Sequence, residues 1–452
     1  MPQSRVYKMI IMKFGGSSVA DEQKINNVAE IVKTKAAENP VVIVSALGGV
    51  TDSLIKAAKL AQSSDWKETA QKVISRHRNV LHSLRLESSM LDGDISELEN
   101  ALSTISSKKQ LSRSALDLVA SFGERMSSKI VAACIRSKGM KCAAYNAYDI
   151  GMVTDSNFGN ADILPETYGA IRREFSRIGK GTIPVITGYI GKDRNGEITT
   201  LGRGGSDYTA SIIGAAIGAE EIQIWTDVNG IMTADPNVVK DARNIKEISY
   251  QEEAELEFLG AKTLHPKGIL PAMQHGIFVR VLNTMNTSDS GTKICNDIGE
   301  DSRVASITSR SGIDAIILLK GDMQPGDDTM HQAIGILKEH RIGVDSILTS
   351  RSTITIVIDN GPAQEVGEAL KELNALGEAT LKKGLSKVSL VGKSISSIYS
   401  INARILSSVK DLSISAVSFG GSENSKSFIV KQEDAEKAIR QLHREFFKHK
   451  GK

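Results

Sequence analysis

The stretch that decides the fold is Met9-Ile10-Ile11-Met12-Lys13-Phe14-Gly15-Gly16-Ser17-Ser18, near the start of the chain. Its apolar residues predict a short buried strand, and its glycines predict a tight turn directly after that strand. A second apolar strand, Pro40–Ser45, ends in Ala46-Leu47-Gly48-Gly49-Val50-Thr51. Each strand is followed by a helical pattern. Two such units in succession favour a parallel α/β sheet whose loops form one ligand face.

Further along the chain, three more apolar segments predict additional strands. They are Ile183–Gly191, Ile222–Asp227 and Phe278–Leu282, and Asp193–Gly196 is typical of a hairpin tip. Residues 60–110 are predicted to be helical and carry no assignable chemistry. The expected fold class is therefore α/β, with a mainly parallel central sheet sandwiched by helices.

Beyond about residue 300 the pattern of elements changes and then repeats. Strand, helix, two strands and helix recur with a period of about 70 residues, since Val344 and Ile414 occupy equivalent places. Each repeat is βαββαβ-like, as in a ferredoxin-type sandwich. We therefore predict a catalytic domain at 1–300 and two small domains at 301–385 and 386–452. Duplicated domains of this kind suggest regulation or dimerisation, with a purely structural tail as the alternative.

Composition limits the classes of function. The chain has 452 residues, 40% of them hydrophobic, and a net charge of +3, so neither nucleic acid nor an anionic membrane surface is a favoured partner. No apolar run approaches the length of a membrane-spanning helix. Three cysteines without metal-ligand spacing predict free thiols in a reducing cytoplasm. The histidines are scattered, so no metal site made by the protein is predicted.

The densest group of binding residues lies between Thr199 and Thr209. Gly202, Gly204 and Gly205 allow the backbone to bring bare N–H groups against an anion. Arg203, Ser206 and Asp207 add a cation, a hydroxyl and a carboxylate, and a buried helix is expected to begin here with its N-terminus facing the anion. The alternative is an ordinary glycine-rich turn before a helix.

Four further clusters supply charge after strands or helices. Lys13 precedes two glycines, Glu124 follows an apolar segment, and Lys262 lies in a turn of small residues. Glu124 is equally compatible with a helix surface and with a partner for a cationic substrate group. Thr226-Asp227 begins a loop suited to a nucleotide, although an ordinary Asn-Gly hairpin is the alternative. Lysines, an anion loop and aspartates together suit phosphoryl transfer, yet neither the usual P-loop nor a dinucleotide fingerprint is present.

Taken together, six motifs resemble the aspartate kinase family in order and spacing over essentially the whole chain. The C-terminal repeat resembles the paired ACT domains of that family. The motifs are Lys13-Phe14-Gly15-Gly16-Ser17-Ser18-Val19, Ser121-Phe122-Gly123-Glu124-Arg125, Asn157-Phe158-Gly159-Asn160-Ala161, Leu201–Tyr208, Trp225-Thr226-Asp227-Val228 and Gly260–Pro266.

The resemblance implies that ATP phosphorylates the side-chain carboxylate of L-aspartate, the first step toward lysine, threonine and methionine. Lys13 would stabilise the transferred phosphoryl group, and Asp207 would orient the cations around it. Arg203 would hold the aspartate carboxylate and Glu124 its ammonium. Mg²⁺ would be carried on the nucleotide phosphates. The remaining implied contacts are Ser45, Thr51 and Ser206 for aspartate, and Gly15, Gly16, Ser17, Thr226, Asp227, Met232 and Lys262, with Lys13, for ATP.

Regulation is the part that the resemblance leaves most open. Val344, Asp345 and Ser350 correspond to the effector loop of the family, but Arg351 places a cation where a lysine effector usually meets an acid. Lysine, threonine or no effector are all compatible with this loop. A homodimer or higher oligomer through the ACT domains is expected. Alternatives to an aspartate kinase are a related kinase of another small acid and a catalytically silent amino-acid sensor.

One departure from the family pattern gives a testable expectation. Members of the family often have Arg where this chain has Asn237. Loss of that cation predicts weaker ATP binding, because a charge-assisted contact to phosphate is missing. The substitution Asn237→Arg should therefore lower the Michaelis constant for ATP in steady-state kinetics. An unchanged constant would count against the assignment of this position.

Overall fold

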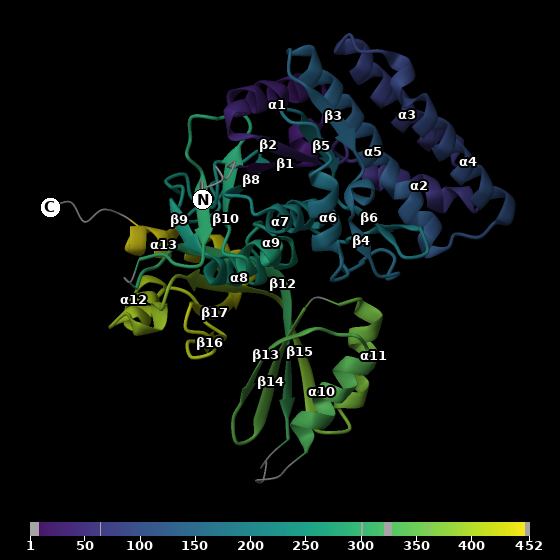
Figure 1. Ribbon diagram of the computed structural model, residues 1–452. Coiled ribbons are helices and arrows are strands. Elements are labelled where there is room, and N and C mark those ends of the chain that lie inside the picture. The colour runs from purple at the N-terminus through teal and green to yellow at the C-terminus, as the bar shows by residue number, and fades with distance from the viewer. Residues whose placement is uncertain (1–8, 64, 300–301, 321–327, 360, 448–452) are drawn as a thin grey trace. The chain divides into compact units, whose positions relative to one another are not determined.

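The computed structural model describes residues 9–63, 65–299, 302–320, 328–359 and 361–447. The chain divides into two compact units, each made of several segments (Figure 1). The first unit comprises Met1–Ile231, Asn244–Ala254 and Thr263–Gly299, and the second comprises Met232–Arg243, Glu255–Lys262 and Glu300–Lys452.

The first unit is built on an eight-stranded sheet. All neighbouring strands run parallel except the pair β10–β11. The predicted α/β fold with a mainly parallel sheet is confirmed. In spatial order the strands are β3 (Cys142–Tyr145), β5 (Ile183–Thr187), β2 (Pro40–Val44), β1 (Ile10–Phe14), β8 (Glu221–Thr226), β10 (Phe278–Asn283), β11 (Thr292–Cys295) and β9 (Glu247–Ser249).

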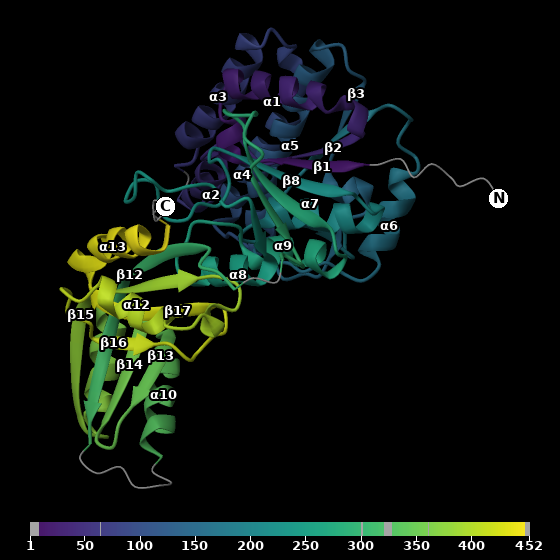
Figure 2. The same cartoon turned by 90° about the vertical axis from the view of Figure 1, so that its left-hand side faces the viewer.

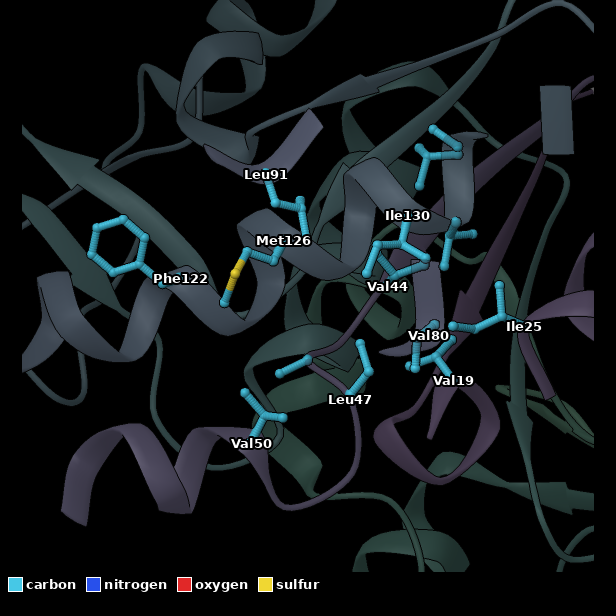
Figure 3. Packing of buried hydrophobic residues seen from close by; sticks show 14 of the residues in the cluster. Val19, Ile25, Val44, Leu47, Val50, Val80, Leu91, Phe122, Met126 and Ile130 are labelled. Carbon is cyan, nitrogen blue, oxygen red and sulfur yellow. The ribbon is translucent and has the colours of Figure 1, made fainter. Parts of the chain in front are cut away.

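The central strand β1 has side chains on two buried faces. Ile10, Met12 and Phe14 lie in a large core that includes buried side chains of five helices. Figure 3 shows ten labelled members of this core, among them residues from the loop after β2 and from α5. The five helices are α1 (Glu22–Thr34), α2 (Val50–Ala61), α3 (Lys67–Ser83), α4 (Asp92–Lys108) and α5 (Arg113–Ser137).

The opposite face of β1 contacts α7. A Cβ built on Gly214 of α7 would lie 2.9 Å from Ile222 and 3.4 Å from Ile11, so this helix packs very close to the sheet. Helix α7 also packs on its neighbours α6 and α9. The bounds are α6 (Thr167–Phe175), α7 (Gly205–Ile217), α8 (Tyr250–Phe258) and α9 (Pro266–Gln274).

A small sheet of three strands lies beside the loops of the first unit, in the order β4 (Val153–Thr154), β6 (Ile190–Asp193) and β7 (Ile198–Thr200). Strands β6 and β7 are antiparallel, which confirms the hairpin predicted at Asp193–Gly196. Cys134, Cys142 and Cys295 are free thiols, as predicted. Within the described ranges, no helix is both long and apolar enough to cross a membrane.

The second unit contains a six-stranded antiparallel sheet covered by helices (Figure 2). The strand order is β13 (Val344–Thr349), β14 (Thr353–Asp359), β12 (Ser306–Leu319), β15 (Glu378–Val391), β17 (Ser425–Lys431) and β16 (Ala416–Ser418). The helices are α10 (Thr329–Glu339), α11 (Ala363–Leu373), α12 (Ile401–Ser408) and α13 (Ala435–Phe447).

Strands β12 and β15 run through both repeats of this sheet. Ile307, in the first half of β12, packs in a core with Phe428 of the second repeat, whereas Ile316, in the second half, packs with Ile356 of the first. The sequence predicts two small domains at 301–385 and 386–452. In the structure both strands are 14 residues long and each half of one pairs with a half of the other, so each strand contributes to both repeats.

A buried ion pair links two strands of this sheet. The Asp345 side chain on β13 is 1% exposed, and it accepts a hydrogen bond of 2.9 Å from Lys387 Nζ on β15. Arg310 Nη1 lies 3.6 Å from the same carboxylate. Because a carboxylate in this environment has little water, its charge depends on these two cations.

We expect Lys387→Met to lower the free energy of unfolding by about 3 kcal/mol, because it leaves a buried carboxylate with one distant cation, Arg310, and a hydrogen bond from the Ser346 hydroxyl. The double substitution of Lys387→Met with Asp345→Leu should recover most of the loss, since both charges are then absent. Thermal unfolding followed by circular dichroism measures both effects. Exposed Lys382 on the same strand is the control, and Lys382→Met with an equal loss would contradict the explanation.

Candidate active site

An ion pair between β1 and α7 lies at the centre of the candidate site. Lys13 alternates with the core residues of β1, so its side chain points to the face that α7 covers. Asp207 lies in the first turn of α7. Lys13 Nζ lies 2.5 Å from Asp207 Oδ1, and each side chain is 12% exposed. A lysine predicted at a strand end and an aspartate predicted at a helix start are thus brought together.

A cavity of about 540 Å³ opens beside this pair. Its lining comes from the ends of parallel strands and from the N-terminus of α7, the usual place for ligands in a fold of this class. Eight residues predicted from the sequence to belong to the site line it: Lys13, Gly16, Ser45, Thr51, Glu124, Arg203, Ser206 and Asp207.

Hydroxyl groups and glycines shape one side of the cavity. Ser45 Oγ, after β2, donates a hydrogen bond of 2.9 Å to Ser206 Oγ, at the start of α7. Gly204 precedes α7 with a φ of +70°, a backbone conformation that residues with a side chain rarely adopt. The predicted helix start is therefore present, and its first N–H groups lie beside the cavity, where an anion would be stabilised.

Glu124 is the most unusual group of the site. It is 3% exposed, and its Oε1 accepts a hydrogen bond of 3.1 Å from the Ala46 amide. Its Oε2 is buried with no hydrogen-bond partner in the described part of the chain. Burial raises the pKa of the Glu124 carboxyl to about 8. Of the two interpretations left open by the sequence, a carboxyl facing a cationic ligand group fits this environment, and an exposed helix surface does not.

The approach of α5 to the loop after β2 depends on the glycine before Glu124. A Cβ on Gly123 would lie only 2.7 Å from the Ala46 Cβ, so a larger residue would push the loop away. Leu47 and Val50 of the loop pack in one core with Met126 of α5 (Figure 3). This packing fixes the distance between the carboxyl of Glu124 and the loop that carries Ser45.

The residues predicted to contact the nucleotide lie at two neighbouring strand ends. Strand β1 pairs with β8 in parallel, with Phe14 opposite Trp225. The Gly15 amide donates a hydrogen bond of 3.4 Å to the Trp225 carbonyl. The turn that contains Gly15, Gly16 and Ser17 therefore lies beside Thr226 and Asp227.

The other predicted residues belong to the second compact unit. Met232 and Lys262 fall in its segments Met232–Arg243 and Glu255–Lys262, and Lys262 is exposed. Their nucleotide contacts stay predictions. Among the effector candidates, Val344 and Ser350 are exposed, whereas the Asp345 carboxylate is buried against Lys387.

Sequence reasoning missed Asp117, which supports the site from α5. Its Oδ2 accepts hydrogen bonds from the amides of Gly159, at 2.9 Å, and Thr200, at 2.7 Å. Burial raises the pKa of Asp117 above its usual range. The residue holds two loops beside the cavity. Its position seven residues before Glu124, on the same face of one helix, is the signal that could have identified it.

Lys267 is a second support that was missed. Its Nζ donates hydrogen bonds of 3.3 Å to Asn160 Oδ1 and to the Ala161 carbonyl, and it lies 2.8 Å from Asp162. It thus connects the start of α9 to the loop that Asp117 also holds. Nothing in the sequence pattern distinguishes this lysine from one that is exposed to solvent.

Comparison with known proteins agrees with this geometry. Residues 8–283 match the amino acid kinase family, and residues 388–446 match the ACT domain. A parallel α/β sheet, a glycine-lined cavity with a lysine–aspartate pair and a C-terminal ACT part together define an amino acid kinase with a regulatory extension.

Individual relatives indicate which kind of amino acid kinase this chain is similar to. Aspartokinase 1 of Arabidopsis thaliana chloroplasts is 34% identical over 97% of this chain and 80% of its own length. The lysine-sensitive aspartokinase 3 of Escherichia coli is 30% identical over 97% of this chain and 99% of its own length. A crystal structure of E. coli aspartokinase III with aspartate and ADP matches 98% of this chain and 100% of its own, with 30% identity and a TM-score of 0.79. The chain belongs to the aspartokinase family.

The raised pKa of Glu124 predicts a pH-dependent cost to stability. Between about pH 4.5, where the unfolded carboxyl titrates, and about pH 8, the native state holds a proton that the unfolded state has lost. Rising pH therefore favours unfolding in this window. We expect the melting temperature of the wild-type chain to fall relative to that of Glu124→Gln between pH 5 and pH 8.

Melting curves of both proteins at these two pH values measure the difference. Exposed Glu99 provides the control, because Glu99→Gln should follow the wild type at both pH values. If Glu124→Gln also runs parallel to the wild type, Glu124 does not titrate as its burial implies.

Proposed function

We propose that this chain transfers the terminal phosphoryl group of ATP to the side-chain carboxylate of L-aspartate, which yields ADP and 4-phospho-L-aspartate. The observation that carries the proposal is the buried Glu124 carboxyl, whose Oε2 has no hydrogen-bond partner among the described residues, in the same cavity as Arg203 and the Lys13–Asp207 pair. Such a cavity offers Glu124 for an ammonium group, Arg203 for a carboxylate and Lys13 for a phosphoryl group. Membership of the aspartokinase family supports the same reaction.

Each charged group of the substrate has a proposed partner. The α-ammonium binds Glu124, which ionises once a cation compensates its burial. Arg203 binds a substrate carboxylate through its planar fork. The hydroxyls of Ser45, Thr51 and Ser206 complete the contacts. The E. coli relative was crystallised with aspartate and ADP, and we transfer this pair of ligands to the present chain by similarity.

The chemistry needs alignment and charge neutralisation more than proton transfer. An aspartate side chain has a pKa of about 3.9, so its carboxylate is already ionised near neutral pH. One carboxylate oxygen attacks the terminal phosphorus, a new P–O bond forms, and the bond to the ADP oxygen breaks. Lys13 neutralises charge on the phosphoryl oxygens, and Asp207 fixes the Lys13 ammonium in place.

The nucleotide is proposed to bind where β1 and β8 end side by side. Backbone N–H groups in the turn after β1 suit phosphate oxygens, because that turn begins the short helix Gly16–Val19. Mg²⁺ would be carried on the phosphates, where it neutralises part of their charge. The proposed contacts are Gly15, Gly16, Ser17, Thr226, Asp227, Met232 and Lys262, together with Lys13.

We extend the proposal to feedback control and assembly. The ACT part would bind an amino-acid effector near Val344, Asp345 and Ser350 and join two or more copies of the chain. The E. coli relative was also crystallised with lysine and aspartate. Here the Asp345 carboxylate is already neutralised by Lys387, so an effector ammonium would share it. Inhibition assays with lysine and with threonine distinguish the two effectors. The product would feed the synthesis of lysine, threonine and methionine.

Trapping of the acyl phosphate tests the reaction directly. With ATP, Mg²⁺ and hydroxylamine, we expect a hydroxamate from L-aspartate and none from glutamate or N-acetylglutamate. Lys13→Met should lower kcat by about 100-fold or more, because a charge that acts in the transition state is lost. The control is Lys33→Met, on the exposed side of α1, which should keep the wild-type kcat.

The alternatives give different outcomes in the same assay. A hydroxamate formed only from another acid would identify a related kinase and contradict the aspartate proposal. Binding of aspartate without any ADP release would identify a silent sensor. Equal activity of Lys13→Met and the wild type would contradict the role of the ion pair.

A further inference from the structure

Arg76 lies on α3, in the helical region to which sequence reasoning assigned no chemistry. Its Nη1 donates a hydrogen bond of 2.7 Å to the Gly48 carbonyl, and its Nη2 donates one of 2.9 Å to the Ala20 carbonyl. These two carbonyls belong to different loops, one after β2 and one after β1. We propose that Arg76 is a positioning residue, which holds the two loops of the active site in register for phosphoryl transfer.

The two loops that Arg76 joins also contact each other directly. The Gly48 amide donates a hydrogen bond of 3.1 Å to the Gly16 carbonyl. A Cβ on Gly16 would lie 3.0 Å from the Ala46 carbonyl oxygen, so the backbones are almost in van der Waals contact. Both Gly16 and Gly48 line the cavity. A change in the spacing of these loops would therefore change the shape of the site itself.

Arginine suits this task better than any other side chain. Its planar guanidinium presents several N–H groups in a fixed fork, so two carbonyls can be held at a set separation. A lysine could reach one of the two carbonyls but would not fix their separation. Glycine loops lose much conformational freedom on ordering, and the fork supplies an external restraint that their own sequence lacks.

The surroundings of Arg76 make the idea open to chemical rescue. Arg76 lines a separate cavity of about 580 Å³, which lies between α1 and α3. Glu22 and Glu68 line the same cavity and favour a cation there. The substitution Arg76→Ala removes the guanidinium group and leaves an empty space that is continuous with this cavity. A free guanidinium ion can therefore enter that space and donate to the same carbonyls.

The inference rests on the proposed function, because the loops matter through their aspartate and phosphate contacts. The Gly16 loop faces phosphate and the loop after β2 faces aspartate. Misplacement of reacting groups by about 1 Å can cost about 100-fold in rate. We therefore expect Arg76→Ala to reduce kcat/KM for aspartate by about 100-fold, through a lower kcat and a higher KM together.

The experiment compares the full chain with Arg76→Ala, Arg76→Lys and Lys72→Ala at a temperature where circular dichroism shows all four folded. Lys72 lines the same cavity from the same helix, and its side chain is 75% exposed. Millimolar guanidinium chloride should raise the kcat/KM of Arg76→Ala by at least about tenfold, and sodium chloride should not. Arg76→Lys should fall between Arg76→Ala and the wild type. Lys72→Ala should behave as the wild type and not respond to guanidinium.

A purely structural role for Arg76 predicts no rescue. Guanidinium is a denaturant and does not stabilise a folded chain, so a variant that is merely destabilised would gain no activity when the ion is added. Wild-type kinetics in Arg76→Ala, or a loss of activity that guanidinium does not reverse, would overturn the inference. Calorimetric binding of ADP needs no turnover and is measured on the same proteins. An inactive wild type would contradict the proposed function, whereas weakened and rescued ADP binding in Arg76→Ala would still support the positioning role.

Discussion

The parallel pairing of β1 with β2 on one side and β8 on the other is the constraint on which the site depends. In this register Phe14 lies opposite Val44 and Trp225, so all three strands end at one edge of the sheet. Backbone hydrogen bonds between parallel strands leave no freedom to shift one end without breaking the ladder. The loops that follow must therefore meet, and the chemistry of three distant segments is concentrated in one place.

Charge within this edge is partly compensated inside the protein and partly left for a ligand. Lys13 and Asp207 compensate each other at 2.5 Å, and their desolvation is therefore tolerable. Glu124 has no such partner, and its burial favours the protonated carboxyl. A cationic substrate group relieves this unfavourable state on binding, so part of the binding free energy arises from a cost already present in the free protein. The burial of Glu124 therefore lowers the stability of the free chain and raises its affinity for an ammonium group.

The sequence allowed the prediction of the groups that lie at strand ends, because glycines and polar residues directly after an apolar strand indicate a ligand loop. Lys13 was identified in this way, and Asp207 by the glycine-rich turn before its helix. The residues around Glu124 left its role open, and the family resemblance supplied it. Asp117 and Arg76 were not identified, because each acts on backbone groups far away in the chain and lies in a helix of ordinary composition. The sharing of β12 and β15 between the two repeats was also missed, since a repeat period shows equivalent elements but not which strand halves pair.

Residues that contact a ligand and residues that position those contact residues therefore differ in how clearly the sequence reveals them. A contact residue must combine a particular chemistry with a particular local backbone, and that combination leaves a motif. A positioning residue such as Arg76 needs only to reach two carbonyls from the side of a helix, and many helix sequences satisfy this need. Because the glycines of the loops are flexible on their own, the rigidity of the site must come from such outside contacts as well as from the sheet. Precision in this site is therefore a tertiary property, held by α3 and α5 around loops whose own sequence provides the chemistry but not its spacing.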